Sequence, residues 1–99
     1  MEQIKNNEGL TLSYDQILIN KMTLYEYKML LEDEQYDTVF SKGKFLDIVL
    51  EGNSKYVLYA IDKFFVEVIW DNEKDEIIGR GVFKEGDSPD RHSNVPKKI

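Results

Sequence analysis

The sequence predicts an α+β fold, in which one or two N-terminal helical segments pack on a four-stranded antiparallel β-meander. Three observations carry this prediction. Apolar residues recur with helical spacing between residues 23 and 41, the spacing changes to the two-residue alternation of strands from Lys44 onward, and short turn signals divide this second region. With 99 residues and no cysteine, we expect a single domain over residues 1–84 that contains no disulfide.

Residues 1–22 are poorly defined by their pattern. Leu10, Leu12 and Tyr14 alternate with hydroxyl side chains and indicate a short strand. The apolar residues 17–19 fit either a strand or a segment that lies under the helix. The sequence therefore assigns no single element to this part of the chain.

Two helical stretches follow. Thr23 and Glu26 fit a capping box, in which the threonine hydroxyl accepts a backbone N–H and the glutamate reaches back to the start of the helix. The helix that begins there presents four apolar residues on one side: Leu24, Tyr27, Leu30 and Leu31. A second stretch over about residues 33–41 ends near Gly43, and the two stretches are also compatible with one kinked helix.

Four strands are expected, at about residues 44–51, 54–61, 64–70 and 77–84. Gly52-Asn53 is typical of a two-residue hairpin loop, because both residues tolerate the positive φ that matches the strand twist. Asp62-Lys63 is expected to form a second two-residue turn, and residues 72–75 a longer loop. The strands therefore join as consecutive hairpins.

These turns predict a register across the sheet. Counting back from them pairs Asp47 with Leu58 and Leu58 with Glu67. The same count makes Glu67 and Arg80 direct cross-strand partners of opposite charge. The face that the helices cover is then expected to hold Leu46, Ile48, Leu50, Val57, Tyr59, Ile61, Phe64, Val66, Val68, Trp70, Ile77 and Phe83, with Gly79 and Gly81 among them.

The opposite face is expected to be apolar as well, although a half-exposed antiparallel sheet is usually polar there. Its apolar residues are Phe45, Val49, Tyr56, Leu58, Ala60, Phe65, Ile69, Ile78 and Val82, around a row of Asp47, Glu67 and Arg80. Because large exposed apolar patches are uncommon on monomers, something is expected to cover this face. Three covers are open: residues 10–19 or the second helix, a second copy of the chain, or another protein.

This second face supplies the predicted interaction residues. Aromatic side chains and arginine near the centre of a patch are the usual anchors of protein interfaces. The predicted interaction face consists of Phe45, Asp47, Val49, Leu58, Phe65, Glu67, Ile69 and Arg80.

After Lys84 the chain becomes polar and contains two prolines. Residues 85–99 are therefore expected to form a mobile C-terminal tail. His92 is the only histidine and lies in this tail, where a solvated side chain is expected.

No catalytic residue, metal site or cofactor site is predicted. Asp71, Glu73 and Asp75 have the spacing of the first ligands of a calcium loop, but Glu76 replaces the required glycine and Val82 replaces the bidentate acid. These residues are interpreted as a charged hairpin loop.

Asp47 and Glu67 form the one carboxylate pair of interest. The register separates them by two strand spacings, roughly 9–10 Å, a distance compatible with inverting glycoside hydrolysis. Arg80 is expected to keep Glu67 ionised, and the pattern implies no cleft. A small enzyme or ligand-binding domain that uses Asp47, Glu67 and Arg80 is therefore kept as an alternative.

The overall charge argues against some partners. The net charge is −6 and the pI is about 4.7, whereas a nucleic-acid surface needs clustered lysine and arginine. No apolar run approaches the roughly 20 residues that span a bilayer, and residues 1–8 do not resemble a signal peptide. We therefore expect a cytoplasmic protein that binds neither nucleic acid nor membrane.

The aromatic hairpin at residues 59–73, with Phe64-Phe65-Val66-Glu67-Val68 at its centre, resembles that of a group of small bacterial proteins. The resemblance covers about residues 34–86, and the shared motif is structural. That group has no assigned activity, so the resemblance implies the hairpin and no particular function.

The preferred functional hypothesis is a small acidic protein-binding module of the docking or inhibitor/immunity type. It would act through the second sheet face, on another protein or on a second copy of itself. The competing hypotheses are the enzyme or ligand-binding domain described above and a purely structural homodimer.

Overall fold

The computed structural model describes residues 21–99 and confirms the α+β class. Two helices, α2 (Leu24–Lys28) and α3 (Glu32–Lys42), precede four strands. The strands are β1 (Lys44–Glu51), β2 (Ser54–Ile61), β3 (Phe64–Asp71) and β4 (Glu76–Lys84), and a 3₁₀ turn, η1 (Asp90–His92), follows them. The strand proposed around residues 10–14 and the apolar run at 17–19 lie outside the described residues.

The capping box at the start of α2 forms as predicted. Thr23 Oγ1 accepts the backbone N–H of Glu26 at 3.1 Å, and Glu26 Oε1 accepts the N–H of Thr23 at 2.8 Å. α2 and α3 are two separate helices, because Leu31 is extended between them, with ψ 158°. Gln35 ties the two together by donating from Nε2 to the carbonyl oxygens of Tyr27 and Leu30.

The four strands form one antiparallel sheet in the order β1-β2-β3-β4. The pairings predicted from the first two turns are present, Asp47 with Leu58 and Leu58 with Glu67. The predicted pairing of Glu67 with Arg80 is wrong, because Glu67 pairs with Gly81. The β2–β3 turn also holds Asp62 at a positive φ of 51°.

Two β-bulges explain the differences from the predicted register. In β1, Phe45 pairs with Tyr59 and Asp47 with Leu58, so that Leu46 is the extra residue. In β4, Ile77 pairs with Trp70 and Gly79 with Ile69, so that Ile78 is the extra residue. A one-residue shift moves every side chain beyond it to the other face of the sheet.

The bulges therefore correct the predicted composition of both faces. Phe45, Arg80 and Val82 lie on the face that the helices cover, not on the opposite one. Leu46 lines a pocket on the opposite face together with Phe65. Gly79, Gly81 and Phe83, predicted to lie under the helices, also belong to that opposite face.

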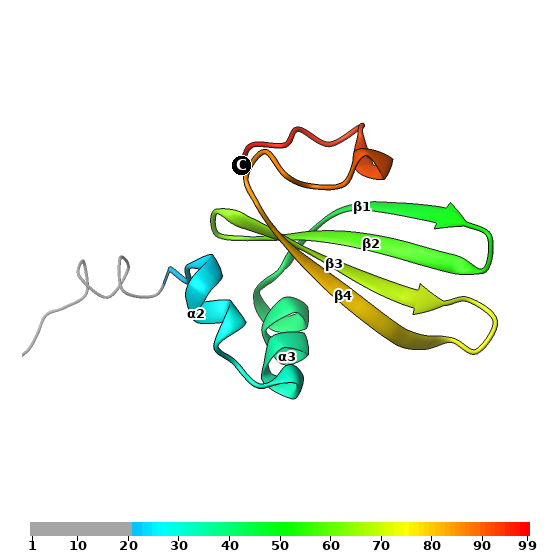
Figure 1. Cartoon of the computed structure of the whole chain (residues 1–99), viewed down its shortest axis with the longest axis horizontal. Coiled ribbons are helices and arrows are strands. Elements are labelled where there is room, and N and C mark those ends of the chain that lie inside the picture. Colours follow the sequence, from blue (N-terminus) through cyan, green and yellow to red (C-terminus); the bar gives the residue numbers. More distant parts are fainter. Residues whose placement is uncertain (1–20) are drawn as a thin grey trace, which may run out of the picture.

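The main core lies between the helices and the sheet. Its buried members are Tyr27, Val39, Ile61, Phe64, Val66 and Val68. The rings of Tyr27 and Phe64 meet at a centroid distance of 5.4 Å. Figure 1 shows that α2 and α3 lie under one end of the sheet, while the strands run on past them toward the two hairpin loops.

The C-terminal segment, residues 85–99, lies against the sheet on the side away from the helices (Figure 1). The sequence predicts a mobile tail here, but the segment is folded: the N–H of Gly86 donates to the carbonyl of Lys97 at 2.7 Å and closes a loop. His92, expected to be solvated, is 1% exposed. The chain therefore has three layers: helices, sheet and C-terminal segment.

Neither of the helices found in residues 21–99 has the length and apolar character to cross a membrane.

Candidate functional site

The predicted interaction residues divide between the two faces of the sheet. Six of them share the second face, as their cross-strand pairings show: Asp47, Val49, Leu58, Phe65, Glu67 and Ile69. The other two, Phe45 and Arg80, lie on the helix face because of the two bulges. The predicted set is therefore not one surface.

The centre of the second face is buried. Leu58 is 0% exposed, Phe65 is 1% exposed and Glu67 is 2% exposed. The cover comes from the chain itself, through the C-terminal segment, which was not among the three covers considered from the sequence. A partner that docks on this centre would first have to displace the segment.

Two side chains of the C-terminal segment, those of Arg91 and His92, reach the carboxylates of the sheet. His92 Nδ1 lies 2.8 Å from Asp47 Oδ2, and its Nε2 lies 2.7 Å from Glu67 Oε2. Arg91 donates from one guanidinium nitrogen to both carboxylate oxygens of Glu67, at 3.0 and 2.9 Å. We refer to Asp47, Glu67, Arg91 and His92 as the charge cluster.

Arg91 has further partners at the edge of this cluster. Its guanidinium lies over the ring of Tyr56, 4.0 Å from the centroid, and its Nε lies 3.6 Å from a carboxylate oxygen of Glu51. Burial acts to lower the pKa of Arg91, but the hydrogen bond to Glu67 and the surrounding negative charge outweigh it and raise the pKa. Arg91 is thus held as a cation.

The geometry of the charge cluster indicates an anchor rather than a reaction centre. Each ring nitrogen of His92 lies within hydrogen-bond distance of one carboxylate, so the imidazole joins Asp47 to Glu67. Arg91 pairs with the carboxylate of Glu67, which meets the requirement that a buried charge be paired. The side chain of His92 is 0% exposed, so no substrate reaches it in this arrangement.

Arg80 takes no part in the charge cluster. On the helix face it donates to Gln35 and Glu32, and its guanidinium lies 5.2 Å from the centroid of the Tyr36 ring. Asp47, Glu67 and Arg80 therefore do not surround a common cleft. Within residues 21–99, no group of three or more His, Cys, Asp or Glu side chains is placed to hold a metal ion.

Sequence reasoning missed Arg91 and His92. A usable signal was present, because two carboxylates had been assigned to an otherwise apolar face and needed cationic partners. The C-terminal segment contains an adjacent arginine and histidine, whose polar surroundings favoured the prediction of a tail.

Apolar side chains remain exposed on the edge strand β1 and near the end of α3, the helix that precedes it. We refer to Phe40, Phe45, Ile48 and Leu50 as the β1 strip; they are 50%, 56%, 47% and 64% exposed. The rings of Phe40 and Phe45 both pack edge-on against Tyr59, at centroid distances of 6.1 and 6.3 Å. Ile48 and Leu50 continue the strip along the helix face of β1.

Within the described part of the chain, the outer backbone edge of β1 pairs with no other strand. β1 is the first strand in the sheet order, so one of its edges faces away from β2. No backbone hydrogen bond joins this outer edge to another segment among residues 21–99. An edge strand of this kind offers unpaired N–H and C=O groups to an incoming chain.

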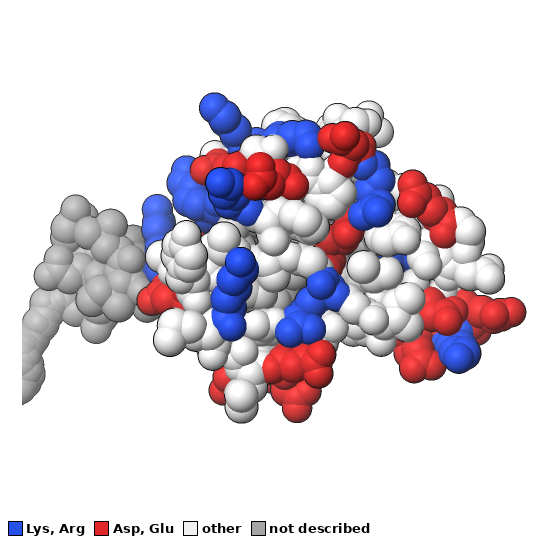
Figure 2. All heavy atoms as spheres, in the orientation of Figure 1, with Lys and Arg blue, Asp and Glu red and all other residues white. Residues whose placement is uncertain are grey.

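Charge differs between the two ends of β1. Glu51 shares one end of the sheet with four further carboxylates: Asp71, Glu73, Asp75 and Glu76. Figure 2 shows acidic side chains gathered at this hairpin end, whereas lysines and arginines lie mainly toward the other end. Lys42 and Lys44 flank the start of β1.

Comparisons with protein-family models, with curated proteins and with solved structures find no match to this chain.

Proposed function

We propose that the chain is a small protein-binding module that docks its partner along the edge strand β1. The observation that carries this proposal is the β1 strip, four large apolar side chains that are 47–64% exposed beside an open strand edge. Scattered single apolar residues on a surface are ordinary, but a row of them along one edge points to a contact. Of the interaction residues predicted from the sequence, only Phe45 belongs to the proposed docking surface. The buried centre of the predicted face is not part of it.

The partner that fits this surface is an extended segment of another protein. Such a segment adds a strand to the sheet, so that main-chain hydrogen bonds supply affinity and alternate side chains supply specificity. Its apolar side chains would lie on Ile48, Leu50 and the aromatic residues around Tyr59. A basic residue would face Glu51 at the hairpin end, and an acidic residue would face Lys44 at the start of the strand.

A chain with this mode of action has no need of a reaction centre. The charge cluster is explained by its role in holding the C-terminal segment, and the acidic surface assists encounter with a basic partner. The proposed setting is the cytoplasm, since a fold without cysteine depends on no oxidising compartment. Docking on an enzyme or toxin, as an inhibitor or immunity protein does, is one form that this function can take.

The test is selection of a displayed library of random linear peptides against the full chain. We expect enriched peptides with apolar residues at alternate positions and a basic residue at one end. Ile48→Lys and Leu50→Lys should each weaken binding of the enriched peptide by about tenfold or more, equivalent to about 1.4 kcal/mol. Ile78→Lys is the matched control, because Ile78 is 56% exposed on the opposite edge strand β4 and should leave binding unchanged.

Light scattering after size-exclusion chromatography, at low and high micromolar concentration, measures the molar mass and distinguishes this proposal from the homodimer hypothesis. A chain that stays monomeric, together with peptide binding that depends on Ile48, supports docking of another protein. A dimer that Ile48→Lys dissociates would assign the β1 strip to a second copy of the chain. Peptides that bind all three lysine variants equally would reject β1 as the docking surface.

A further inference from the structure

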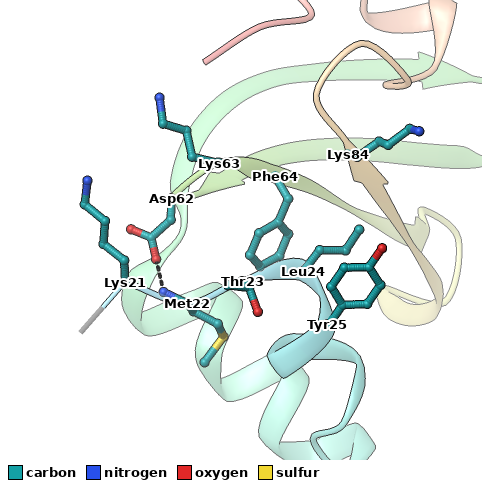
Figure 3. A pocket seen from close by; sticks show the side chains of 9 residues that line it. All are labelled: Lys21, Met22, Thr23, Leu24, Tyr25, Asp62, Lys63, Phe64 and Lys84. Atoms are coloured by element: carbon teal, nitrogen blue, oxygen red, sulfur yellow. Dashed lines mark hydrogen bonds between the residues drawn. The ribbon is translucent and has the colours of Figure 1, made fainter. Parts of the chain in front are cut away.

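A pocket lies beside the start of α2, apart from the β1 strip. Its volume is about 460 Å³, within the range of roughly 300–1,000 Å³ that is usual for small-molecule sites. One wall is formed by residues 21–25, and the other by the β2–β3 turn and the end of β4. Figure 3 shows the side chains that line it.

The two walls are held together by a long-range contact. Asp62 Oδ2, in the β2–β3 turn, accepts the backbone N–H of Met22 at 2.6 Å, across 40 residues of sequence (Figure 3). The capping box of Thr23 and Glu26 then turns the chain into α2. The contact between Met22 and Asp62 therefore joins the two walls of the pocket.

The interior of the pocket is apolar. The half-buried Met22 and Leu24 supply aliphatic surface, the buried Phe64 lies beneath it, and Tyr25, which is 76% exposed, also lines the pocket. Phe64 itself is 2% exposed and belongs to the core, so that the floor of the pocket is rigid. A ligand that fills this space needs an apolar body.

The charged groups that line the pocket favour an anionic ligand. Lys21, Lys63 and Lys84 all line it, in a chain whose net charge is −6. Asp62 is the one carboxylate among the lining residues, and its Oδ2 already accepts the N–H of Met22. Lysines carry compact, mobile charges that suit a carboxylate or phosphate head without demanding a fixed geometry.

We infer that this pocket binds a small amphipathic anion, namely an aliphatic chain with a carboxylate head. The apolar body would lie against Met22 and Leu24. The head would lie at the rim, near Lys21 and Lys63 on one side or Lys84 on the other (Figure 3). This site is independent of the proposed docking along β1, because the two surfaces share no residue. The chain would then carry two separate functions, a protein contact and a ligand site.

The experiment is isothermal titration calorimetry of the full chain with decanoate, below the concentration at which it forms micelles. Decylammonium is the probe of opposite charge and decanol the uncharged one. We expect saturable binding of decanoate that weakens as salt is added, weaker binding of decanol, and no binding of decylammonium. Equal binding of decanoate and decylammonium would overturn the anion assignment.

Two variants test the residues of the pocket. The double substitution Lys63→Glu/Lys84→Glu should lower the affinity for decanoate by about tenfold or more, and Tyr25→Ala should lower it by a smaller factor. Lys74→Glu, in the β3–β4 loop, is the matched control and should leave the affinity unchanged. Circular dichroism of each variant shows whether the fold is retained.

Several results would overturn the inference. One is the absence of saturable decanoate binding by the full chain, and another is unchanged affinity in the Lys63→Glu/Lys84→Glu variant. A third is a set of nuclear Overhauser contacts between the Phe64 ring and residues 1–20 in the free protein, which would mean that the chain itself fills the pocket. Loss of decanoate binding in Ile48→Lys would show that the pocket and the β1 strip are not independent sites.

Discussion

On the helix face of the sheet, aromatic and aliphatic side chains such as Tyr27 and Phe64 fill the space between the layers. On the other face, a segment with few large apolar residues is held by Arg91 and His92, which reach the half-buried carboxylate of Asp47 and the buried carboxylate of Glu67. Both arrangements bury the sheet, but the first depends on apolar area and the second on a few ionic contacts.

The difference has a physical consequence for each layer. Apolar burial is non-directional and roughly proportional to area, so many residues share the stabilisation of the helices. A buried ion pair stabilises only while each partner is present, because removing one leaves an unpaired charge in the interior. The C-terminal segment should therefore detach as a unit when one member of the charge cluster is lost, whereas the helices should not.

The largest effect is expected from Phe64→Ala. Phe64 is 2% exposed and packs against the Tyr27 ring, so its removal leaves a cavity in the core and should cost about 3–5 kcal/mol. Urea unfolding, followed by fluorescence of the single tryptophan, measures this cost. Tyr25→Ala, at a residue 76% exposed, is the control and should change stability little. Equal costs for the two variants would contradict the placement of the core.

Glu67→Ala should have the next largest effect. It removes the carboxylate that Arg91 and His92 share, and the loss of one partner in a buried ionic group costs about 3–5 kcal/mol. We expect a value at the lower end, because the side chain of Arg91 is 30% exposed and can recover contact with water. Global stability is measured by urea unfolding.

The rate at which trypsin cleaves the same variant tests whether the C-terminal segment detaches from its face of the sheet. Detachment of the C-terminal segment frees the backbone around Arg91, so Glu67→Ala should speed cleavage within residues 85–99 under native conditions. Glu73→Ala, at an exposed residue of the β3–β4 loop, is the control for loss of a carboxylate. Slow cleavage that persists in Glu67→Ala would show that the charge cluster does not hold the segment.

Tyr27 gives the helix face a dependence on alkaline pH. Burial raises the pKa of Tyr27 from 10.0 to about 12, although the charge of Arg80 opposes the shift. Between these values the unfolded chain has released the phenolic proton while the folded chain still holds it, so stability falls as pH rises from 10 to 12. This contribution is fully present below pH 10.

Tyr27→Phe tests this dependence. The substitution removes the hydrogen bond from the Tyr27 hydroxyl to the Gln35 carbonyl, and should cost about 1 kcal/mol at neutral pH. It should also flatten the fall in stability between pH 10 and 12, as urea unfolding at a series of pH values would show. The slope should not vanish, because burial also raises the pKa of Tyr59. An unchanged slope would mean that Tyr27 ionises in the folded chain as it does in the unfolded one.

Periodicity and turn chemistry predicted much of the fold. The capping box of Thr23, the hairpin loop Gly52-Asn53 and the pairing of Leu58 with Glu67 depend on local sequence, and all are present. The bulge at Ile78 has a local signal in Gly79, which follows it, because a glycine within a strand often marks a bulge. The predicted register instead places Gly79 on the face that the helices cover. No comparable signal accompanies the bulge at Leu46.

The candidate surfaces were less predictable for a different reason. Hydrophobic patterns report apolar burial, so they identified the helix face and missed a segment that docks through Arg91 and His92. The β1 strip depends on how far α3 extends under the sheet, which is a property of tertiary packing. Phe45 was predicted as an interaction residue, but its exposure at the strand edge follows from the bulge beside it.

The smallest expected effect is a coupling energy. Two double-mutant cycles measure it and distinguish the predicted register from the observed one. If Glu67 and Arg80 were cross-strand partners, Glu67→Ala and Arg80→Ala would be coupled. In the structure Arg80 pairs with Val68 and Glu67 with Gly81, so their side chains point to opposite faces. Their effects on stability should therefore add to within about 0.3–0.5 kcal/mol.

The matched cycle uses Glu67→Ala with Arg91→Ala, whose side chains share two hydrogen bonds. Residues in one ionic network are typically coupled by about 0.5–3 kcal/mol, so this cycle should fall clearly outside additivity. Arg80→Ala alone should cost about 1–3 kcal/mol, because it leaves the buried side-chain oxygen of Gln35 without its donor, whereas the ion pair with the exposed Glu32 adds little. If Arg80 proves coupled to Glu67 and Arg91 does not, then the bulge at Ile78 is misplaced and the C-terminal segment has no ionic anchor on the sheet.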